Sequence, residues 1–317
     1  MESKKTFVVI NTHFIGDTIL TNSLVQNIKR LYENSKVVMV TSPALAEIAK
    51  YLKGVDEVYV WDRFKKDHGF INNLKFILKF PYKRPYAAFP IYGTDRPVLI
   101  SKLIGAKYIL CPLQKFFSRF RNSKYPIDCS PQNAQEQIMN LLTGITKEKL
   151  IDVPIIMEVP DKKIPAIENL QDYIVIIPTS TRTTKEFPIE MTKDIISNLQ
   201  DNKIVFLGSG KFAKDYSEKL AEYNFENLID LSGKTSLEDA AVIIKNSKAV
   251  IASDTGLMHM SCALQKPTLA LFFEQNVGGF MPKKELYNCN VICDDYSIEN
   301  IMKNFNEITG KKESINV

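Results

Sequence analysis

A strand-like run, a polar corner and a second strand-like run are the features that most constrain the fold of this chain. Residues 249–251 are apolar, the corner Asp254-Thr255-Gly256 follows, residues 260–264 have helical character, and residues 268–273 are apolar again. Two buried strands joined through a helix form a right-handed parallel βαβ unit. We therefore expect the corner at the carboxyl end of a parallel strand, where open α/β sheets bind ligands.

The corner itself allows two interpretations. The amides of Thr255, Gly256 and Leu257 would begin a helix, where N–H groups without intrahelical partners and the helix dipole favour an anion such as a phosphate. Gly256 would let that phosphate come close to the backbone. In the second interpretation, Asp254 only caps the helix through its carboxylate. The corner alone leaves both open.

The same alternation of strands and helices runs through both halves of the chain. Strand-like runs lie within residues 6–10, 36–40, 55–60, 87–92 and 108–110, and again within 173–177, 203–207, 228–231, 249–251 and 268–273. Helical spacing occurs between many of them. It predicts, for example, a helix from Gly16 to Leu31. Prolines interrupt the charged stretch 147–165, which indicates a domain boundary. We predict an α/β protein of two Rossmann-like, doubly wound domains facing across a cleft, residues 1–155 and 156–317, the second ending in a helix from Ser297.

Positive charge is concentrated in the first half. Residues 1–150 contain 23 Lys and Arg against 12 Asp and Glu, whereas residues 151–317 contain 18 against 24. Basic and aromatic residues alternate in segments 62–84 and 115–124. A solvated face with inward aromatic rings would explain these segments. An acidic substrate, or an anionic lipid surface in which Phe and Tyr rest at the interface, would explain them too. Nucleic acid ranks last because no recognisable nucleic-acid-binding module accompanies them.

The sequence predicts neither a disulfide framework nor a metal site. The five cysteines are an odd number and form no Cys-x-x-Cys pair. The histidines, His13, His68 and His259, are too far apart in sequence to suggest a metal pair, and the chain contains no Asp-x-Asp triplet. The apolar runs are shorter than the ~20 residues of a membrane span, and no signal peptide is evident. We expect a cytoplasmic protein.

A second corner follows the strand-like run 173–177 and suits a diphosphate. Residues 179–185 supply several hydroxyls, among them those of Thr179 and Thr181, and two cations, Arg182 and Lys185. Lys185 and the amides after Asp254 would neutralise the phosphates without the paired carboxylates that hold a divalent metal, so we infer a metal-independent site. A polar surface loop is the alternative. Gly208-Ser209-Gly210 would admit a nucleotide, but such turns also join ordinary strands and helices.

Three blocks of the chain resemble glycosyltransferase family 9, the bacterial heptosyltransferases of lipopolysaccharide core assembly. They are Ile15 to Thr21, the loop 179–188 ending in Lys185-Glu186-Phe187-Pro188, and Ser253 to Met260 with the following Lys266 to Phe272. The resemblance implies a GT-B fold. It also implies inverting transfer from a nucleotide-diphosphate sugar, typically ADP-heptose, which is a substrate; no cofactor and no metal is required.

The resemblance further implies roles for single residues. The donor phosphates would lie on the second domain, at Thr181, Lys185, Thr255, Gly256 and Leu257; Thr179, Asp254 and His259 stand in the same blocks and complete the predicted site. Asp17 matches the proposed general base of the family.

Two residues in or beside the first block need separate consideration. A carboxylate such as that of Asp17 at a helix N-terminus stays ionised and could accept a proton from an acceptor hydroxyl. Its alternative role is that of an N-cap. His13 stands where Ser is common in the family, and its role stays open.

The complete prediction is a cytoplasmic enzyme peripheral to the anionic inner-membrane surface. It would add a heptose-like sugar to an acidic lipid-linked oligosaccharide bound by the first domain, with no nucleic-acid partner. Two other functions stay open on the same scaffold. One is a sugar-nucleotide epimerase, and the other is a sugar-nucleotide-binding protein without catalysis.

Overall fold

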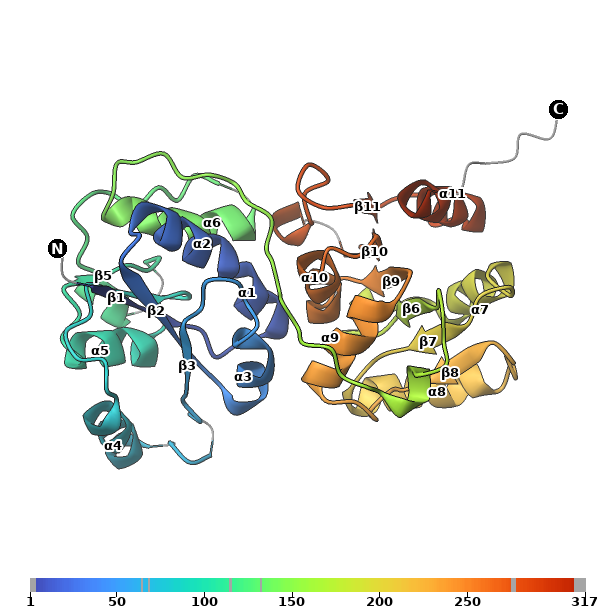
Figure 1. Ribbon diagram of the computed structural model, residues 1–317, viewed down its shortest axis with the longest axis horizontal. Coiled ribbons are helices and arrows are strands. Elements are labelled where there is room, and N and C mark those ends of the chain that lie inside the picture. Colours follow the sequence, from blue (N-terminus) through green and yellow to red (C-terminus); the bar gives the residue numbers. More distant parts are fainter. Residues whose placement is uncertain are drawn as a thin grey trace. The chain divides into compact units, whose positions relative to one another are not determined.

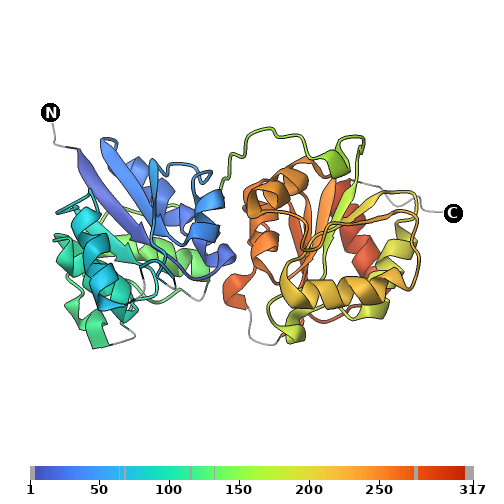
Figure 2. The same ribbon diagram turned by 90° about the horizontal axis from the view of Figure 1, so that it is seen from below.

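The computed structural model describes residues 4–63, 65–67, 69–113, 116–131, 133–274 and 278–310. The chain forms two compact units, Met1–Ile155 and Ile156–Val317, which appear in Figures 1 and 2. Phe64, His68 and Lys115, which belong to sequence features considered above, lie outside the described residues.

Unit 1 is built on a parallel sheet with the strand order β3-β2-β1-β4-β5. Its strands are β1 (Lys5–Ile10), β2 (Ser35–Thr41), β3 (Glu57–Val60), β4 (Ala87–Pro90) and β5 (Tyr108–Ile109). Its helices are α1 (Ile15–Leu20), α2 (Asn22–Leu31), α3 (Pro43–Ala49), α4 (Phe70–Lys79), α5 (Asp95–Leu103) and α6 (Ala134–Asn140), with 3-10 turns at Phe116–Phe120 and Leu141–Gly144. Figure 1 shows α2 and α6 on one side of this sheet and α5 on the other.

Alternation along the strands decides what packs on each face of this sheet. Val8 and Ile10 of β1 belong to one core with Trp61 and with Phe76 and Phe80 of the segment that contains α4. Both of these phenylalanines are buried. The alternative in which aromatic rings of this segment rest in a membrane interface therefore does not hold for these two: they hold α4 against the sheet.

The helix predicted from Gly16 to Leu31 is two helices, α1 and α2. Thr21, between them, donates its hydroxyl to the carbonyl oxygen of Thr18 at 2.6 Å. A side-chain hydroxyl that donates to a carbonyl oxygen of the helix competes with the backbone N–H groups for that acceptor. This competition explains why the regular helix is interrupted there.

Unit 2 is a parallel sheet with the order β11-β10-β9-β6-β7-β8. Its strands are β6 (Ile174–Ile177), β7 (Ile204–Phe206), β8 (Leu228–Asp230), β9 (Ala249–Ser253), β10 (Thr268–Leu271) and β11 (Cys289–Ile292). Its helices are α7 (Ile189–Asn198), α8 (Gly210–Ala221), α9 (Leu237–Asn246), α10 (Gly256–Ala263) and α11 (Ile298–Thr309), with 3-10 turns at Pro165–Ile167, Thr183–Lys185 and Gly278–Phe280. Ser297 caps α11 by accepting a hydrogen bond from the amide of Asn300.

The register of unit 2 places three strand ends side by side. Ile177 of β6 pairs with Ala252 of β9, and Ser253 of β9 pairs with Leu271 of β10. The segments that leave these strands therefore begin at the same edge of the sheet, where ligands bind in open parallel sheets. Within the described part of the chain, every helix is too short or too polar to cross a membrane.

Candidate functional site

The helix that follows β9 is not capped by the aspartate of the corner. Thr255, not Asp254, occupies the N-cap position of α10, and no side chain makes a capping hydrogen bond there. The interpretation of Asp254 as the cap is therefore wrong. The first helical amides, those of Gly256 and Leu257, lie where an α-helix offers no acceptor of its own, and the dipole favours an anion beside them.

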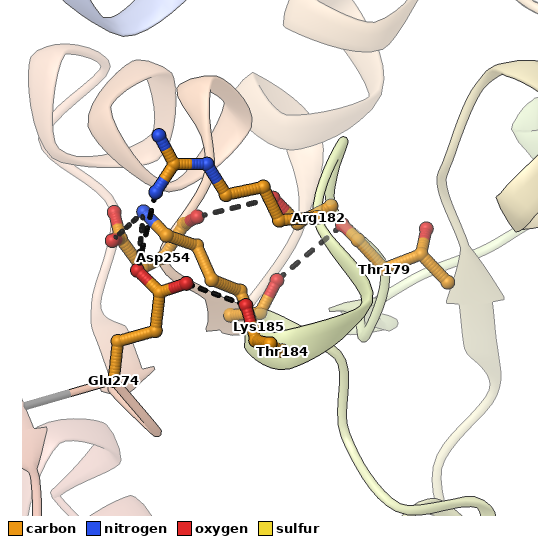
Figure 3. Close-up of polar contacts among 8 residues, drawn as sticks. Thr179, Arg182, Thr184, Lys185, Asp254 and Glu274 are labelled. Carbon is orange, nitrogen blue, oxygen red and sulfur yellow. Dashed lines mark hydrogen bonds and ion pairs between the residues drawn. The ribbon is translucent and has the colours of Figure 1, made fainter.

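The loop after β6 delivers Lys185 to this corner. A 3-10 turn, Thr183–Lys185, directs the lysine toward the strand end. Its ammonium group forms an ion pair with the carboxylate of Asp254, and its Nζ lies 3.7 Å from Oε2 of Glu274 (Figure 3). Only 16% of the Lys185 side chain and 8% of the Asp254 side chain are exposed, so both charges are largely withdrawn from water.

Glu274, just after β10, completes this group and was not predicted. Thr184 donates its hydroxyl to Glu274 Oε1 at 2.5 Å, and Arg182 lies 3.5 Å from Oε2. The hydrogen bond from Thr184, followed by the positive charges of Lys185 and Arg182, lowers the pKa of Glu274. The carboxylate is therefore ionised at neutral pH, and the two cations of the group face two anions.

The other predicted residues of this site lie around the same strand ends. Thr179 is buried, and its carbonyl oxygen accepts a hydrogen bond from the Ser253 hydroxyl at 3.3 Å. Thr181 is exposed farther along the same loop. Gly208 is required by close packing: a Cβ there would stand 2.7 Å from the Ala213 Cβ and 2.9 Å from Thr179 Oγ1.

His259 lies in the second turn of α10 and is buried. Burial lowers its pKa to about 4; the negative charge of Asp254 opposes this shift and the positive charge of Lys185 adds to it. The imidazole is therefore neutral at physiological pH. It adds no charge to the corner and can act only as a neutral hydrogen-bonding group.

Asp17, the predicted base, lies in unit 1. It is buried in the first turn of α1, whose N-cap position is held by Phe14 without a side-chain hydrogen bond, so the interpretation of Asp17 as the N-cap is wrong. Its carboxylate is hydrogen-bonded to Tyr92, which follows β4. Burial, then the charge of Asp17 and this hydrogen bond, raises the pKa of Tyr92. Sequence reasoning missed Tyr92, although its place at the end of the strand-like run 87–92 was a usable signal.

Basic side chains gather near this pair. The ring of His13 packs on that of Tyr92 with centroids 4.5 Å apart. Burial and the charge of Arg63 lower the pKa of His13, and burial and the charge of Arg96 lower that of Arg63. The buried hydroxyl of Thr12 has no hydrogen-bond partner among the described residues. This neighbourhood suits an anion that also carries hydroxyl groups.

The described residues contain no group of three or more His, Cys, Asp or Glu side chains arranged to hold a metal ion. Positive charge at the corner of unit 2 comes from Lys185, from Arg182 and from the start of α10.

Two Rossmann-like units with parallel sheets, each with polar residues after its strands, define a protein of the GT-B class, as predicted. Residues 117–306 match the family model described as glycosyltransferase family 9 (heptosyltransferase). The chain belongs to this family, which confirms the resemblance seen in its sequence motifs.

Individual relatives agree with this assignment. The chain is 36% identical to lipopolysaccharide heptosyltransferase 2 of Salmonella typhimurium over 86 residues, which are 26% of this chain and 24% of that protein. The match thus spans about a quarter of that relative. The glycosyl transferase family 9 structure from Veillonella parvula has a TM-score of 0.80 at 18% identity and covers 98% of this chain and 94% of that one.

A second solved structure carries a bound ligand. The E. coli heptosyltransferase WaaC with ADP-2-deoxy-2-fluoro heptose has a TM-score of 0.74 at 20% identity, over 95% of this chain and 99% of that one. At these identities the two solved structures establish the shared fold.

Proposed function

We propose that this protein transfers a heptose or a related sugar from a nucleotide-diphosphate sugar to an acidic lipopolysaccharide or lipooligosaccharide core acceptor. The observation that carries the proposal is the corner of a family 9 chain where Lys185 pairs with Asp254, just before the first amides of α10. ADP-heptose is the proposed donor, since a structural neighbour is a heptosyltransferase bound to an ADP-heptose analogue.

Unit 2 is the proposed donor domain. The diphosphate would accept hydrogen bonds from the amides of Thr255, Gly256 and Leu257, with the hydroxyl of Thr181 and the ammonium group of Lys185 beside it. Thr179, Asp254 and His259 would support this arrangement, because they position the loop, the lysine and the helix. Lysine and helix amides together offer the positive potential that other enzymes take from a divalent metal, so we propose that no metal and no cofactor is required.

Unit 1 is the proposed acceptor domain, and Asp17 the general base. An acceptor hydroxyl would give its proton to the Asp17 carboxylate as its oxygen bonds to the anomeric carbon. The bond from that carbon to the diphosphate breaks in the same displacement, so the sugar inverts its configuration. The nucleotide diphosphate leaves with the electron pair, and the α10 amides and Lys185 stabilise its added negative charge.

The acceptor is proposed to be acidic because of the charge in unit 1. Arg63 and Arg96 repel one another, and His13 stands close to Arg63. A carboxylate or phosphate of the acceptor would relieve that repulsion. We assign the enzyme to the cytoplasmic face of an anionic inner membrane, where a lipid-linked acceptor is held, and we assign it no nucleic-acid partner.

Release of ADP from ADP-heptose, with and without a core oligosaccharide acceptor, tests the function. A transferase releases ADP only in proportion to acceptor glycosylated, and mass spectrometry of the acceptor then shows the added heptose. Conversion of the sugar nucleotide without acceptor would make the protein an epimerase. Saturable binding of ADP-heptose with no reaction across a panel of core acceptors would make it a binding protein, and either result contradicts the proposal.

A further inference from the structure

Unit 1 exposes an unusual share of large apolar side chains. Ten of the twelve exposed large hydrophobic residues among those described belong to it. Three of them lie on α4: Ile71, Leu74 and Leu78 are 67%, 43% and 70% exposed. Their spacing, three and then four residues, puts them on one face of the helix. Figure 1 shows α4 at the outer edge of unit 1.

This outer face is not the one that holds α4 to the protein. The inner face carries Phe76 and Ile77, which are buried in the core with Trp61. The indole Nε1 of Trp61 also donates a hydrogen bond to Asn73 Oδ1 at 3.2 Å. An amphipathic surface helix ordinarily turns its polar face outward once its apolar face is buried. Here α4 is apolar on both faces. The outer face is therefore an exposed apolar surface of the kind that a binding partner covers.

Charge identifies the chemistry of that partner. Lys75 and Lys79 are exposed and border this face, because Lys75 follows Ile71 by four residues and Lys79 follows Lys75 by four. The helix contains no acidic residue. Lys83, just beyond it, donates a hydrogen bond to the carbonyl of Ile77 and thereby satisfies the helix end. Aliphatic residues bordered by lysines match a bilayer surface. The aliphatic side chains would contact the acyl chains, and the lysines would contact the anionic headgroups.

We propose that the outer face of α4 docks unit 1 on an anionic membrane, with Ile71, Leu74 and Leu78 inserted and Lys75 and Lys79 at the headgroups. This deepens the proposed function and rests on it for the lipid-linked acceptor. A second copy of the chain fits less well, because two such faces brought together would oppose lysine with lysine. The residues proposed to insert are aliphatic, whereas the ring of Phe76 is buried in the core.

Vesicle co-sedimentation of the full chain tests the proposal without any turnover. The wild type should bind phosphatidylglycerol-containing vesicles more tightly than pure phosphatidylcholine vesicles. The double variant Leu74→Ser/Leu78→Ser should need roughly tenfold more lipid for half-binding, since two inserted side chains are lost. Leu103→Ser is the matched control: it removes an exposed leucine from α5 of the same unit and should bind like the wild type. Equal weakening in both variants would contradict the assignment to α4.

A second pair of variants separates the two parts of the face. Lys75→Gln/Lys79→Gln should abolish the preference for anionic vesicles and the sensitivity of binding to salt, while leaving weak binding to neutral vesicles. Vesicle binding that survives both double variants unchanged would overturn the proposal. Sedimentation velocity gives the competing outcome: a wild-type dimer that the leucine variant dissociates, without a change in lipid binding, would make α4 a self-association face.

Turnover on a water-soluble acceptor fragment keeps this proposal distinct from the proposed function. The leucine variant should retain wild-type kcat on that fragment and lose rate only on acceptor embedded in anionic vesicles. Loss on both substrates, in a variant that melts at the wild-type temperature, would contradict a docking role. An inactive wild type that still binds vesicles through α4 would refute the proposed function alone.

Discussion

Lys185 and Asp254 lie 69 residues apart in the sequence and form an ion pair where β6 and β9 end. Glu274, from the end of β10, lies 3.7 Å from the same ammonium group. The cation proposed to bind a donor diphosphate is therefore shared by two carboxylates. A diphosphate must compete with them, which makes the acidic partners as important for donor affinity as the lysine.

Glu274→Gln should tighten ADP binding. The substitution keeps an acceptor for the Thr184 hydroxyl but removes one negative charge from beside the diphosphate, which we expect to be worth about 1 kcal/mol, or roughly a fivefold lower Kd. Isothermal titration with ADP measures the change. Glu190→Gln, an exposed glutamate on α7 of the same unit, should leave the Kd as it is. Weaker ADP binding in Glu274→Gln would show that this carboxylate helps to hold the donor.

Lys185→Ala should weaken ADP binding by roughly 10- to 100-fold. A charged hydrogen bond to a partly desolvated phosphate contributes about 1.5–3 kcal/mol, and its loss also leaves Asp254 as an uncompensated negative charge. Arg182→Ala is the control: its side chain is 68% exposed, and we expect a less than about fivefold change. Titration of both variants with ADP measures the two changes in Kd. Equal changes would mean that general positive charge, rather than the position of Lys185, attracts the donor.

Chelation should not affect the reaction. If Lys185 and the amides of α10 neutralise the leaving diphosphate, the initial rate of ADP release is the same after dialysis against EDTA as before. Loss of rate in EDTA that magnesium restores would refute the metal-independent mechanism. In that case Asp254 and Glu274, the carboxylates nearest Lys185, would be the first residues to substitute.

His259 should make the protein less stable in mild acid. Its pKa is about 4 in the folded chain against an ordinary value of 6.5, so between these pH values the unfolded state binds the extra proton. The free energy of unfolding therefore falls as the pH drops from 6.5 toward 4, by on the order of 3 kcal/mol. Urea unfolding at several pH values should show a shallower dependence in His259→Asn. The same slope in both proteins would contradict the buried, neutral state of His259.

The alternation of strands and helices could be predicted from the sequence. Both sheets are parallel and buried on two faces, so most of their strands are continuous apolar runs. β11 was missed because Asn290 interrupts its apolar character. The interruption between α1 and α2 was missed because it depends on one hydroxyl, that of Thr21, and leaves the apolar spacing intact.

The residues of the candidate site could be predicted only where they stand in local sequence motifs. Lys185, Asp254 and the start of α10 stand in recognisable blocks, and the register of β6 and β9 brings these blocks together. Glu274 and Tyr92 were not foreseen, because their importance comes from partners that only the fold brings close. The burial of one face of α4 and the exposure of the other also follow from tertiary packing, since both faces have apolar residues.

The proposed mechanism is tested most directly by measuring both turnover and ADP binding in Asp17→Asn. The substitution keeps the size of the side chain and removes its capacity to accept a proton, so kcat for ADP-heptose with acceptor should fall by at least about 100-fold. The Kd for ADP should stay within about twofold of wild type, because the proposed donor site lies in unit 2. Asp95→Asn, an acid in the first turn of α5, is the control and should retain turnover. Wild-type-like turnover in Asp17→Asn would contradict the mechanism.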